Sequence, residues 1–178
     1  MNVSSIVDYI VCTINSNIKH QDSELFTGKY IPNINITKFL FLINDFFECS
    51  EYIHICAIIY LLKLAENSDI NININTIHRL IIISYILSVK NYKDNIYTNK
   101  FYSQISGIDL NEINELEIIA LEKLNYKKFI SVEEFDKYFY SMVFHTNTCQ
   151  KCYDNNIFFH IGSFNIIPFP EQHKWEKL

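Results

Sequence analysis

A fold made only of α-helices is what this 178-residue chain predicts, with a five-helix bundle flanked by one N-terminal and one C-terminal helix. The chain contains only three glycines and three prolines, so the turn signals that separate short strands are few. Its apolar residues recur at three- and four-residue spacings, the period of an amphipathic helix. Hydrophobic residues make up 49% of the chain, and its length suits one substantial core rather than two.

The N-terminal segment, residues 1–34, is expected to hold one amphipathic helix and a polar linker. The helix covers residues 4–17, and its apolar face carries Ile6, Tyr9, Ile10 and either Thr13 or Ile14. The linker that follows passes through Gly28 and Pro32.

The bundle is expected over residues 35–128, and its first two helices bury large apolar side chains. The first covers residues 37–48 and turns inward Phe39, Leu40, Ile43, Phe46 and Phe47. Ser50 caps the second, which covers residues 51–66 and turns inward Ile53, Ala57, Tyr60, Leu61 and Leu64. Residues 69–75 alternate isoleucine and asparagine, but such low-complexity sequence between two helical patterns favours a loop.

The third bundle helix, residues 76–91, is apolar nearly all round, which predicts a place in the centre of the bundle. Asn75 is its expected N-terminal cap. Its most apolar stretch, residues 80–89, is interrupted by Ser84, Tyr85 and Ser88 and is far shorter than the roughly 20 residues that cross a bilayer. We therefore expect this helix to be buried in protein and no membrane to be a partner.

Capping residues delimit the last two bundle helices. Thr98 begins a short helix that ends at Gly107, a position suited to a left-handed C-terminal cap. Asp109 and Glu112 then match a capping box for a helix that continues to residue 124. The inner face of that helix is expected to be Ile113, Leu116, Ala120, Leu121 and Leu124.

The C-terminal segment, residues 129–178, is expected to contain one helix and an irregular tail. Ser131 and Glu134 form a second capping box, for a helix that continues to residue 144. The tail shows no sustained period and is too short for another five helices of about 10 residues each.

Charge and cysteine usage exclude several classes of function. The net charge is -5, and 14 lysines are scattered along the chain with a single arginine, so no basic stripe could neutralise a run of phosphates. Nucleic acid is therefore not an expected partner. Five cysteines at irregular spacing, and no basic region leading into an apolar run at the N-terminus, indicate reduced thiols in a cytoplasmic or nuclear protein.

Several short segments narrow the prediction further, because their order and the number of residues between them match those of one known family. They are N-T-I-H-R-L at 75–80, S-V-K at 88–90, Y-T-N at 97–99, I-S-G-I at 105–108 and E-I-N-E-L-E at 112–117. Together with A-I-I-Y-L at 57–61, they resemble the P-type cyclins, a group related to plant U-type and fungal phosphate-signalling cyclins. The resemblance covers residues 35–140 and implies a single cyclin box at 35–128.

This resemblance implies a regulatory subunit that binds and activates a cyclin-dependent protein kinase, in cell-cycle or nutrient-response control. In that family a lysine at the end of the third helix and a glutamate in the fifth grip the kinase, and these positions are Lys90 and Glu117 here. Leu121 and Tyr126 match the family's apolar contacts on the same edge. No cofactor is implied, because the family acts by docking.

Four further residues of the matching segments are expected to be structural: His78, Arg79, Asn99 and Gly107. The planar fork of the arginine suits an internal bidentate salt bridge between helices. The neighbouring histidine suits a structural hydrogen bond.

The chain also departs from the family, and the departures keep an alternative open. Asn91 replaces an aromatic residue after the lysine, Lys93 replaces the first residue of an acidic pair, and Ser106 replaces a glycine. The alternative is a cyclin-box adaptor or scaffold that binds other proteins without activating a kinase. An independent enzyme is not expected, because no nucleophile, base and orienting acid group together.

A zinc-compatible pattern, H-x3-C-x2-C-x7-H, is formed by His145, Cys149, Cys152 and His160. Such a pattern arises easily in a chain with five cysteines and six histidines, and the usual longer loop between ligand pairs is missing. We therefore expect no metal at these residues, and both cysteines to be reduced.

Overall fold

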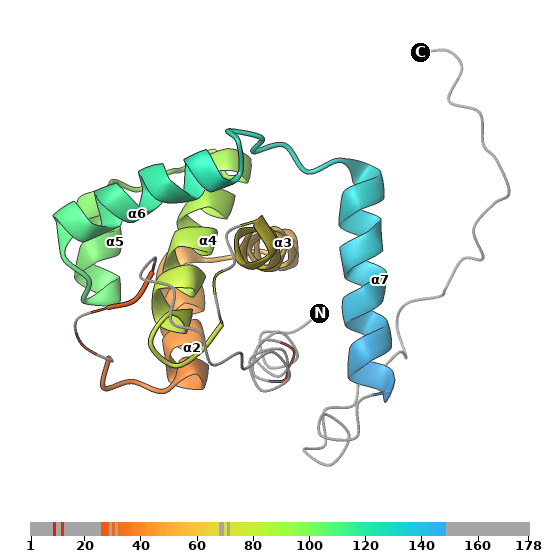
Figure 1. The fold of residues 1–178 in the computed structure, drawn as a ribbon, viewed down its shortest axis with the longest axis horizontal. Helices are drawn as coiled ribbons and strands as arrows, with labels where there is room; N and C mark the ends of the chain where they lie inside the picture. The colour runs from red at the N-terminus through yellow and green to blue at the C-terminus, as the bar shows by residue number, and fades with distance from the viewer. Residues whose placement is uncertain are drawn as a thin grey trace, which may run out of the picture.

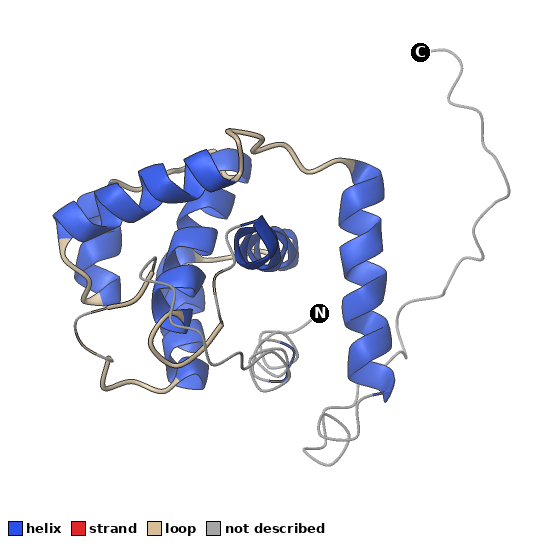
Figure 2. Ribbon diagram, in the orientation of Figure 1, coloured by secondary structure: helices blue, strands red, loops and turns tan. Residues whose placement is uncertain are grey.

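Residues 9, 12, 26–28, 30, 32–67, 70 and 72–148 are described in the computed structural model, with 145–148 described by their backbone alone. All regular structure in these residues is helical (Figure 2). The helices are α2 (Ile36–Phe47), α3 (Glu51–Asn67), α4 (Ile77–Tyr92), α5 (Asn99–Ser106), α6 (Leu110–Lys123) and α7 (Val132–Thr148). The predicted all-α fold is confirmed, and α2 to α6 form the predicted bundle.

Two predicted segments lie outside this description. The helix expected over residues 4–17 is represented only by Tyr9 and Cys12, which are both helical and buried. The irregular tail after residue 148 is not described. In the described part of the chain, no helix is long and apolar enough to cross a membrane.

Helix α4 runs through the middle of the bundle, as its all-round apolar sequence predicted (Figure 1). Every residue from Ile77 to Val89 is buried. The helix packs against α2, α3, α5 and α6. Its burial on all sides follows from this position, because no face of the helix remains for solvent.

The start of α4 differs from the prediction by one residue, since Thr76 and not Asn75 is the cap. Residues 74–76 form a turn in which the N–H groups of Thr76 and Ile77 both donate to the carbonyl of Asn73, at 3.2 and 2.9 Å. The described part of the predicted loop before it contains no strand. Ile70 and Ile72 each expose only 4% of their surface, so these two isoleucines join the core from a loop, whereas Ile74 is 52% exposed.

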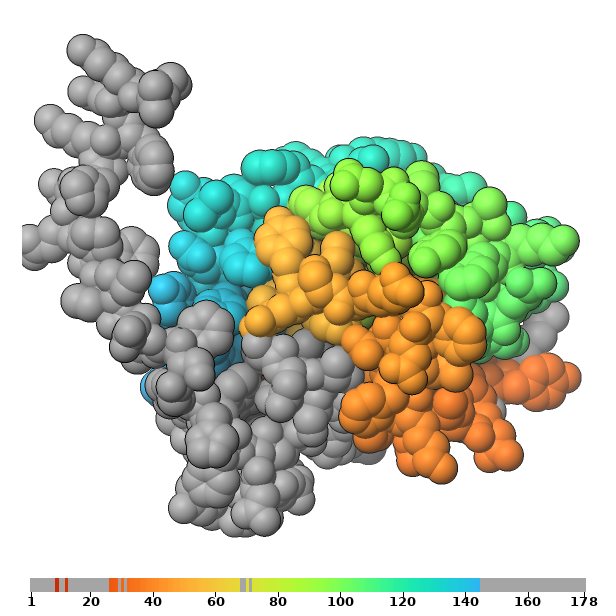
Figure 3. Space-filling view, turned by 180° about the vertical axis from the view of Figure 1, so that it is seen from behind, coloured from red at the N-terminus to blue at the C-terminus, as the bar shows by residue number. Residues whose placement is uncertain are grey.

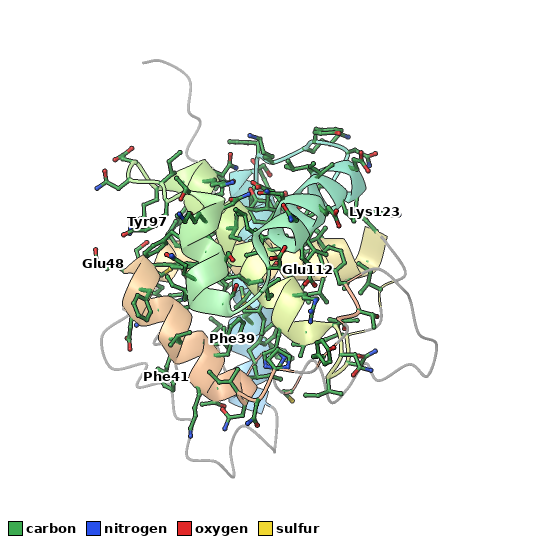
Figure 4. The ribbon with its side chains drawn as sticks, turned by 90° about the vertical axis from the view of Figure 1, so that its left-hand side faces the viewer. Phe39, Phe41, Glu48, Tyr97, Glu112 and Lys123 are labelled. Atoms are coloured by element: carbon green, nitrogen blue, oxygen red, sulfur yellow. The ribbon has the colours of Figure 1, made fainter. Side chains whose placement is uncertain are left out.

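Helix α2 begins after Asn35, whose side-chain oxygen accepts a hydrogen bond from the N–H of Lys38 at 2.8 Å. Four of the five side chains predicted to face inward are buried, namely Phe39, Leu40, Ile43 and Phe47. The prediction was wrong for Phe46, which is 49% exposed because it lies at the edge of the apolar face. Figure 4 shows Phe39 directed inward and Phe41 on the outer side of the helix.

Helix α3 is covered on more than one side. Ser50 accepts a hydrogen bond from the N–H of Ile53 at 3.4 Å, as expected for a cap. All five side chains predicted to face inward are buried, and so are most of their neighbours, because α4 and α7 both pack against this helix. Figure 1 shows α3 nearly end-on between these two helices.

The ends of α5 and α6 follow their predicted caps. Thr98 accepts from the N–H of Phe101, and Gly107 has a left-handed φ of 69°. Ser106, in place of a family glycine, is the last helical residue of α5, and its hydroxyl donates to the carbonyl of Tyr102 at 2.8 Å. Asp109 accepts from the N–H of Asn111 at 2.8 Å at the start of α6.

Helix α7 stands against α3, away from the rest of the bundle (Figure 1). Ser131 caps it by accepting from the N–H of Glu134 at 3.2 Å, and it ends at Thr148, four residues later than predicted. An ion pair between Lys63 and Glu134 (2.8 Å) and the stacked rings of Tyr52 and Phe135 join it to α3.

Candidate functional site

The two charged residues singled out by sequence meet at the surface of the bundle. Lys90 lies in the last turn of α4 and Glu117 in the middle of α6. The Nζ atom of Lys90 is 2.7 and 2.8 Å from the two carboxylate oxygens of Glu117. Because α4 and α6 pack side by side, residues 27 positions apart in sequence form one ion pair.

Asn99, the first residue of α5, joins this pair. Its side-chain oxygen accepts from Lys90 at 2.8 Å, while its nitrogen donates to Glu117 at 2.7 Å and to Asn114 at 2.7 Å. The side chains of Lys90 and Glu117 are 29% and 15% exposed. Asn99 therefore hydrogen-bonds to both members of the ion pair.

The two apolar site residues flank the end of α6. Leu121 is half-buried one turn after Glu117, and Tyr126 is 63% exposed. The N–H of Tyr126 donates to the carbonyl of Leu121 at 2.8 Å, and Tyr126 has a left-handed φ of 57°. The structure thus brings an ion pair and an exposed aromatic ring to one edge, which could bind a partner by charge and by apolar contact.

The two departures after Lys90 both make internal contacts. The side-chain nitrogen of Asn91 donates to the hydroxyl of Tyr60 and to the carbonyl of Lys128, each at 2.9 Å. Lys93 donates to the carbonyl of Phe47 at 2.6 Å, at the C-terminal end of α2, where a positive charge is favourable. Their side chains therefore stabilise this bundle.

Arg79 and His78 both make internal contacts. Arg79 pairs through its Nε with Glu112, so the second residue of the predicted capping box joins α6 to α4. The contact is made through Nε of Arg79 and one carboxylate oxygen of Glu112, so the predicted bidentate form is wrong. His78 makes a hydrogen bond through Nε2 with the carbonyl of Ile34 at 2.8 Å and packs beside the ring of Phe39.

The described residues do not test the prediction made for the zinc-compatible pattern. His145 lies in α7 but only its backbone is described, and Cys149, Cys152 and His160 lie outside the described residues. The absence of zinc stays a prediction.

Comparison with known proteins settles the family. The sequence pattern of the family described as Cyclin matches residues 11–128, which is more than half of the chain. The chain belongs to the cyclin family. This cyclin is 33% identical over 130 residues to Cyclin-U4-3 of Arabidopsis thaliana, an alignment that covers 72% of this chain and 59% of the relative.

Two further relatives of this cyclin extend the same grouping. Cyclin-P3-1 of Oryza sativa subsp. japonica is 28% identical over 70% of this chain and 53% of its own length. The PHO85 cyclin-like protein psl1 of Schizosaccharomyces pombe is 29% identical over 64% of this chain and 48% of its own length. The predicted resemblance to P-type and U-type cyclins is confirmed. This cyclin spans about half the length of the curated relatives it matches.

Three residues of this edge were not predicted from the sequence. Tyr60 was expected only as a core residue, yet its hydroxyl reaches the chain after α6. Tyr92 and Phe129 were not predicted to take part, although the first hydrogen-bonds to the same stretch and the second is 76% exposed within it. The period of a helix indicates which rings are buried, but it does not indicate which group the hydroxyl of a buried tyrosine bonds to.

Proposed function

We propose that this cyclin is a non-catalytic regulatory subunit that binds and activates a cyclin-dependent protein kinase. The observation that carries the proposal is the Lys90–Glu117 ion pair, which lies partly exposed at the edge where Leu121 and Tyr126 follow. These are the positions at which the cyclin family grips its kinase. One relative is named PHO85 cyclin-like, which supports a partner of the same kind for this chain.

The proposed action is mechanical. Docking of this edge beside the mobile regulatory helix of the kinase moves that helix inward, so that its glutamate pairs with the ATP-binding lysine. Phosphoryl transfer depends on that pair and belongs to the kinase. This chain supplies shape and charge, and the same proposal assigns it to the cytoplasm or the nucleus, with no nucleic acid or membrane as partner.

The test is capture and activation with defined kinases. The tagged full chain is co-expressed with a panel of cyclin-dependent kinases that includes PHO85, and each captured complex is assayed for protein phosphorylation. We expect one kinase or more to be captured in stoichiometric amount and to become more active than without this chain. Capture without activation would instead support the adaptor alternative, and capture of no kinase would contradict the proposal.

A further inference from the structure

Three side chains of α3 and α4 converge on one main-chain oxygen, the carbonyl of Lys128 between α6 and α7. Asn91 donates to it at 2.9 Å and the Tyr92 hydroxyl at 3.3 Å, and the Tyr60 hydroxyl donates to it as well. Two residues further on, the N–H of Ile130 donates to the hydroxyl of Tyr92 at 3.0 Å. Tyr60, Asn91 and Tyr92 are called the Lys128 clamp below.

The connection that the clamp holds, residues 124–131 between α6 and α7, begins with residues in an unfavourable backbone conformation. Asn125 and Tyr126 have successive left-handed φ values of 51° and 57°, and neither is glycine. Such residues cost free energy and persist where surrounding contacts over-determine them. The other hydrogen bonds of this stretch are local, such as those from Lys127 to Leu124 and from Lys128 to Tyr126. The clamp therefore supplies contacts that fix the connection against the body of the bundle.

This connection carries the most exposed aromatic rings of the candidate edge. Tyr126 is 63% exposed and Phe129 is 76% exposed, and Lys127 and Lys128 beside them are also exposed. An open pocket of about 560 Å³ lies between the connection and the end of α4, lined by Asn91, Tyr92, Tyr126, Lys127, Lys128 and Phe129. In the space-filling view, the light-green end of α4 and the teal connection lie next to each other (Figure 3).

We propose that the Lys128 clamp positions the kinase-binding edge: by holding this carbonyl it sets where Tyr126 and Phe129 project beside the end of α4. The inference rests on the proposed function. Asn91, the departure from the family's aromatic residue, is central to it because a phenyl ring has no N–H donor. The aromatic contact absent at position 91 is supplied instead by the rings of the connection.

The hydroxyl of Tyr60 is suited to this task. Its ring is completely buried, and burial raises the pKa of Tyr60 well above its usual range, so the hydroxyl stays protonated and can donate. Replacing tyrosine by phenylalanine keeps the ring and removes only the donor. The change can therefore be made without a cavity in the core.

The experiment compares variants of the full chain. The clamp variant combines Tyr60→Phe with Asn91→Leu, and the surface variant is Phe129→Ala. Tyr85→Phe is the matched control, because it removes a buried hydroxyl that bonds to His54 in another part of the core. Amide hydrogen exchange of residues 127–130 is measured in the free chain, and affinity is measured for the panel kinase that the unchanged chain captures.

In the clamp variant we expect exchange at residues 127–130 to become at least about fivefold faster and kinase affinity to fall about tenfold. Tyr85→Phe should lower the melting temperature while leaving both quantities unchanged. Phe129→Ala should weaken the kinase affinity without changing the amide hydrogen exchange of Ile130, whose N–H donates to Tyr92 of α4. Clamp-variant affinity or exchange equal to that of the unchanged chain would overturn the inference, whereas no capture by the unchanged chain would overturn the proposed function and this inference with it.

Discussion

The carboxylate of Glu117 receives three hydrogen bonds, two from Lys90 and one from Asn99, while its side chain is only 15% exposed. A half-buried carboxylate that loses its cation costs more free energy than a solvated surface charge. The pair therefore joins α4 to α6. At the scale of single residues, the proposed binding contact and the stability of the bundle depend on the same atoms.

Lys90→Ala is accordingly expected to affect both properties. The free energy of unfolding should fall by about 1–2 kcal/mol, because Glu117 keeps only Asn99 as a hydrogen-bond donor. Kinase affinity should fall about 30-fold, as when one member of a partly desolvated charged contact is truncated. Chemical unfolding and the capture assay measure the two effects. Kinase capture that survives this substitution at full strength would contradict the proposed edge.

The matched control for this substitution is Lys38→Ala, a lysine exposed on α2. It should change the free energy of unfolding by less than about 0.5 kcal/mol and leave capture intact. Lys63 is unsuitable as a neutral control, because it pairs with Glu134 and helps to hold α7 against α3.

His54 gives the fold a dependence on pH. Its ring is 2% exposed, with Nδ1 2.7 Å from the Tyr85 hydroxyl and Nε2 3.1 Å from the side-chain oxygen of Asn44. These contacts suit a neutral ring that accepts at Nδ1 and donates from Nε2. Burial lowers the pKa of His54 from 6.5 to about 4. The pKa of His54 is lower in the folded chain than in the unfolded chain. Its contribution to the free energy of unfolding is therefore complete above pH 6.5 and is lost as the pH falls toward 4.

From this group we expect the free energy of unfolding to fall by about 3 kcal/mol between pH 7 and pH 4. Urea unfolding at pH 7, 5.5 and 4 measures it. The His54→Gln variant, which has no titrating ring, should be less stable at pH 7 but should lose correspondingly less on acidification. An equal loss in both proteins would show that other groups cause the acid sensitivity.

At the scale of helices, α6 carries Glu117 and is fixed at both ends. Asp109 caps its first turn, and Glu112 in that turn pairs with Arg79 of α4. Its last turn continues into the left-handed residues Asn125 and Tyr126. The position of one charged site residue therefore depends on capping contacts made two helical turns away.

Asp109→Ala should lower the free energy of unfolding by about 1 kcal/mol, because the N–H of Asn111 loses its acceptor and the helix terminus loses a negative charge. Asp109→Asn is the matched control, since an amide oxygen can still accept at this position. Its loss should be clearly smaller in the same unfolding measurement. If the two variants were equally stable, the side-chain hydrogen bond would not be the source of the stabilisation.

At the scale of the whole molecule, described residues that precede α2 contribute to the core. Phe26 is 2% exposed, and the N–H of Gly28 donates to the carbonyl of Asn75. A Cβ atom at position 28 would clash with the guanidinium of Arg79. This glycine therefore leaves the room in which Arg79 reaches Glu112.

Gly28→Ala is expected to displace the guanidinium and to cost about 1–3 kcal/mol of unfolding free energy. The same substitution made in an Arg79→Ala background should cost much less, because the clashing group is gone. A double-mutant cycle from chemical unfolding gives both values. Equal costs in the two backgrounds would place the effect in the glycine backbone instead.

The helices, the central place of α4 and the membership of the cyclin family could all be predicted from the order of the amino acids. Each of these depends on residues that are close together in the sequence or on their order along it. Thr98, Asp109 and Ser131 accept hydrogen bonds from N–H groups two or three positions away, and the buried face of a helix recurs every three to four residues. The order of the matching segments, from residue 75 to 117, is also a property of the chain alone.

The partners of the polar side chains could not be predicted in this way and are seen in the folded chain. Glu112 pairs with a residue 33 positions away, Asn91 with a carbonyl 37 positions away, and Tyr60 with the same carbonyl 68 positions away. Such contacts depend on the relative position of two packed helices along their axes, and no local sequence pattern encodes this position. Phe46 was misplaced for the same reason, because a residue at the edge of an apolar face is buried only if a neighbouring helix covers it.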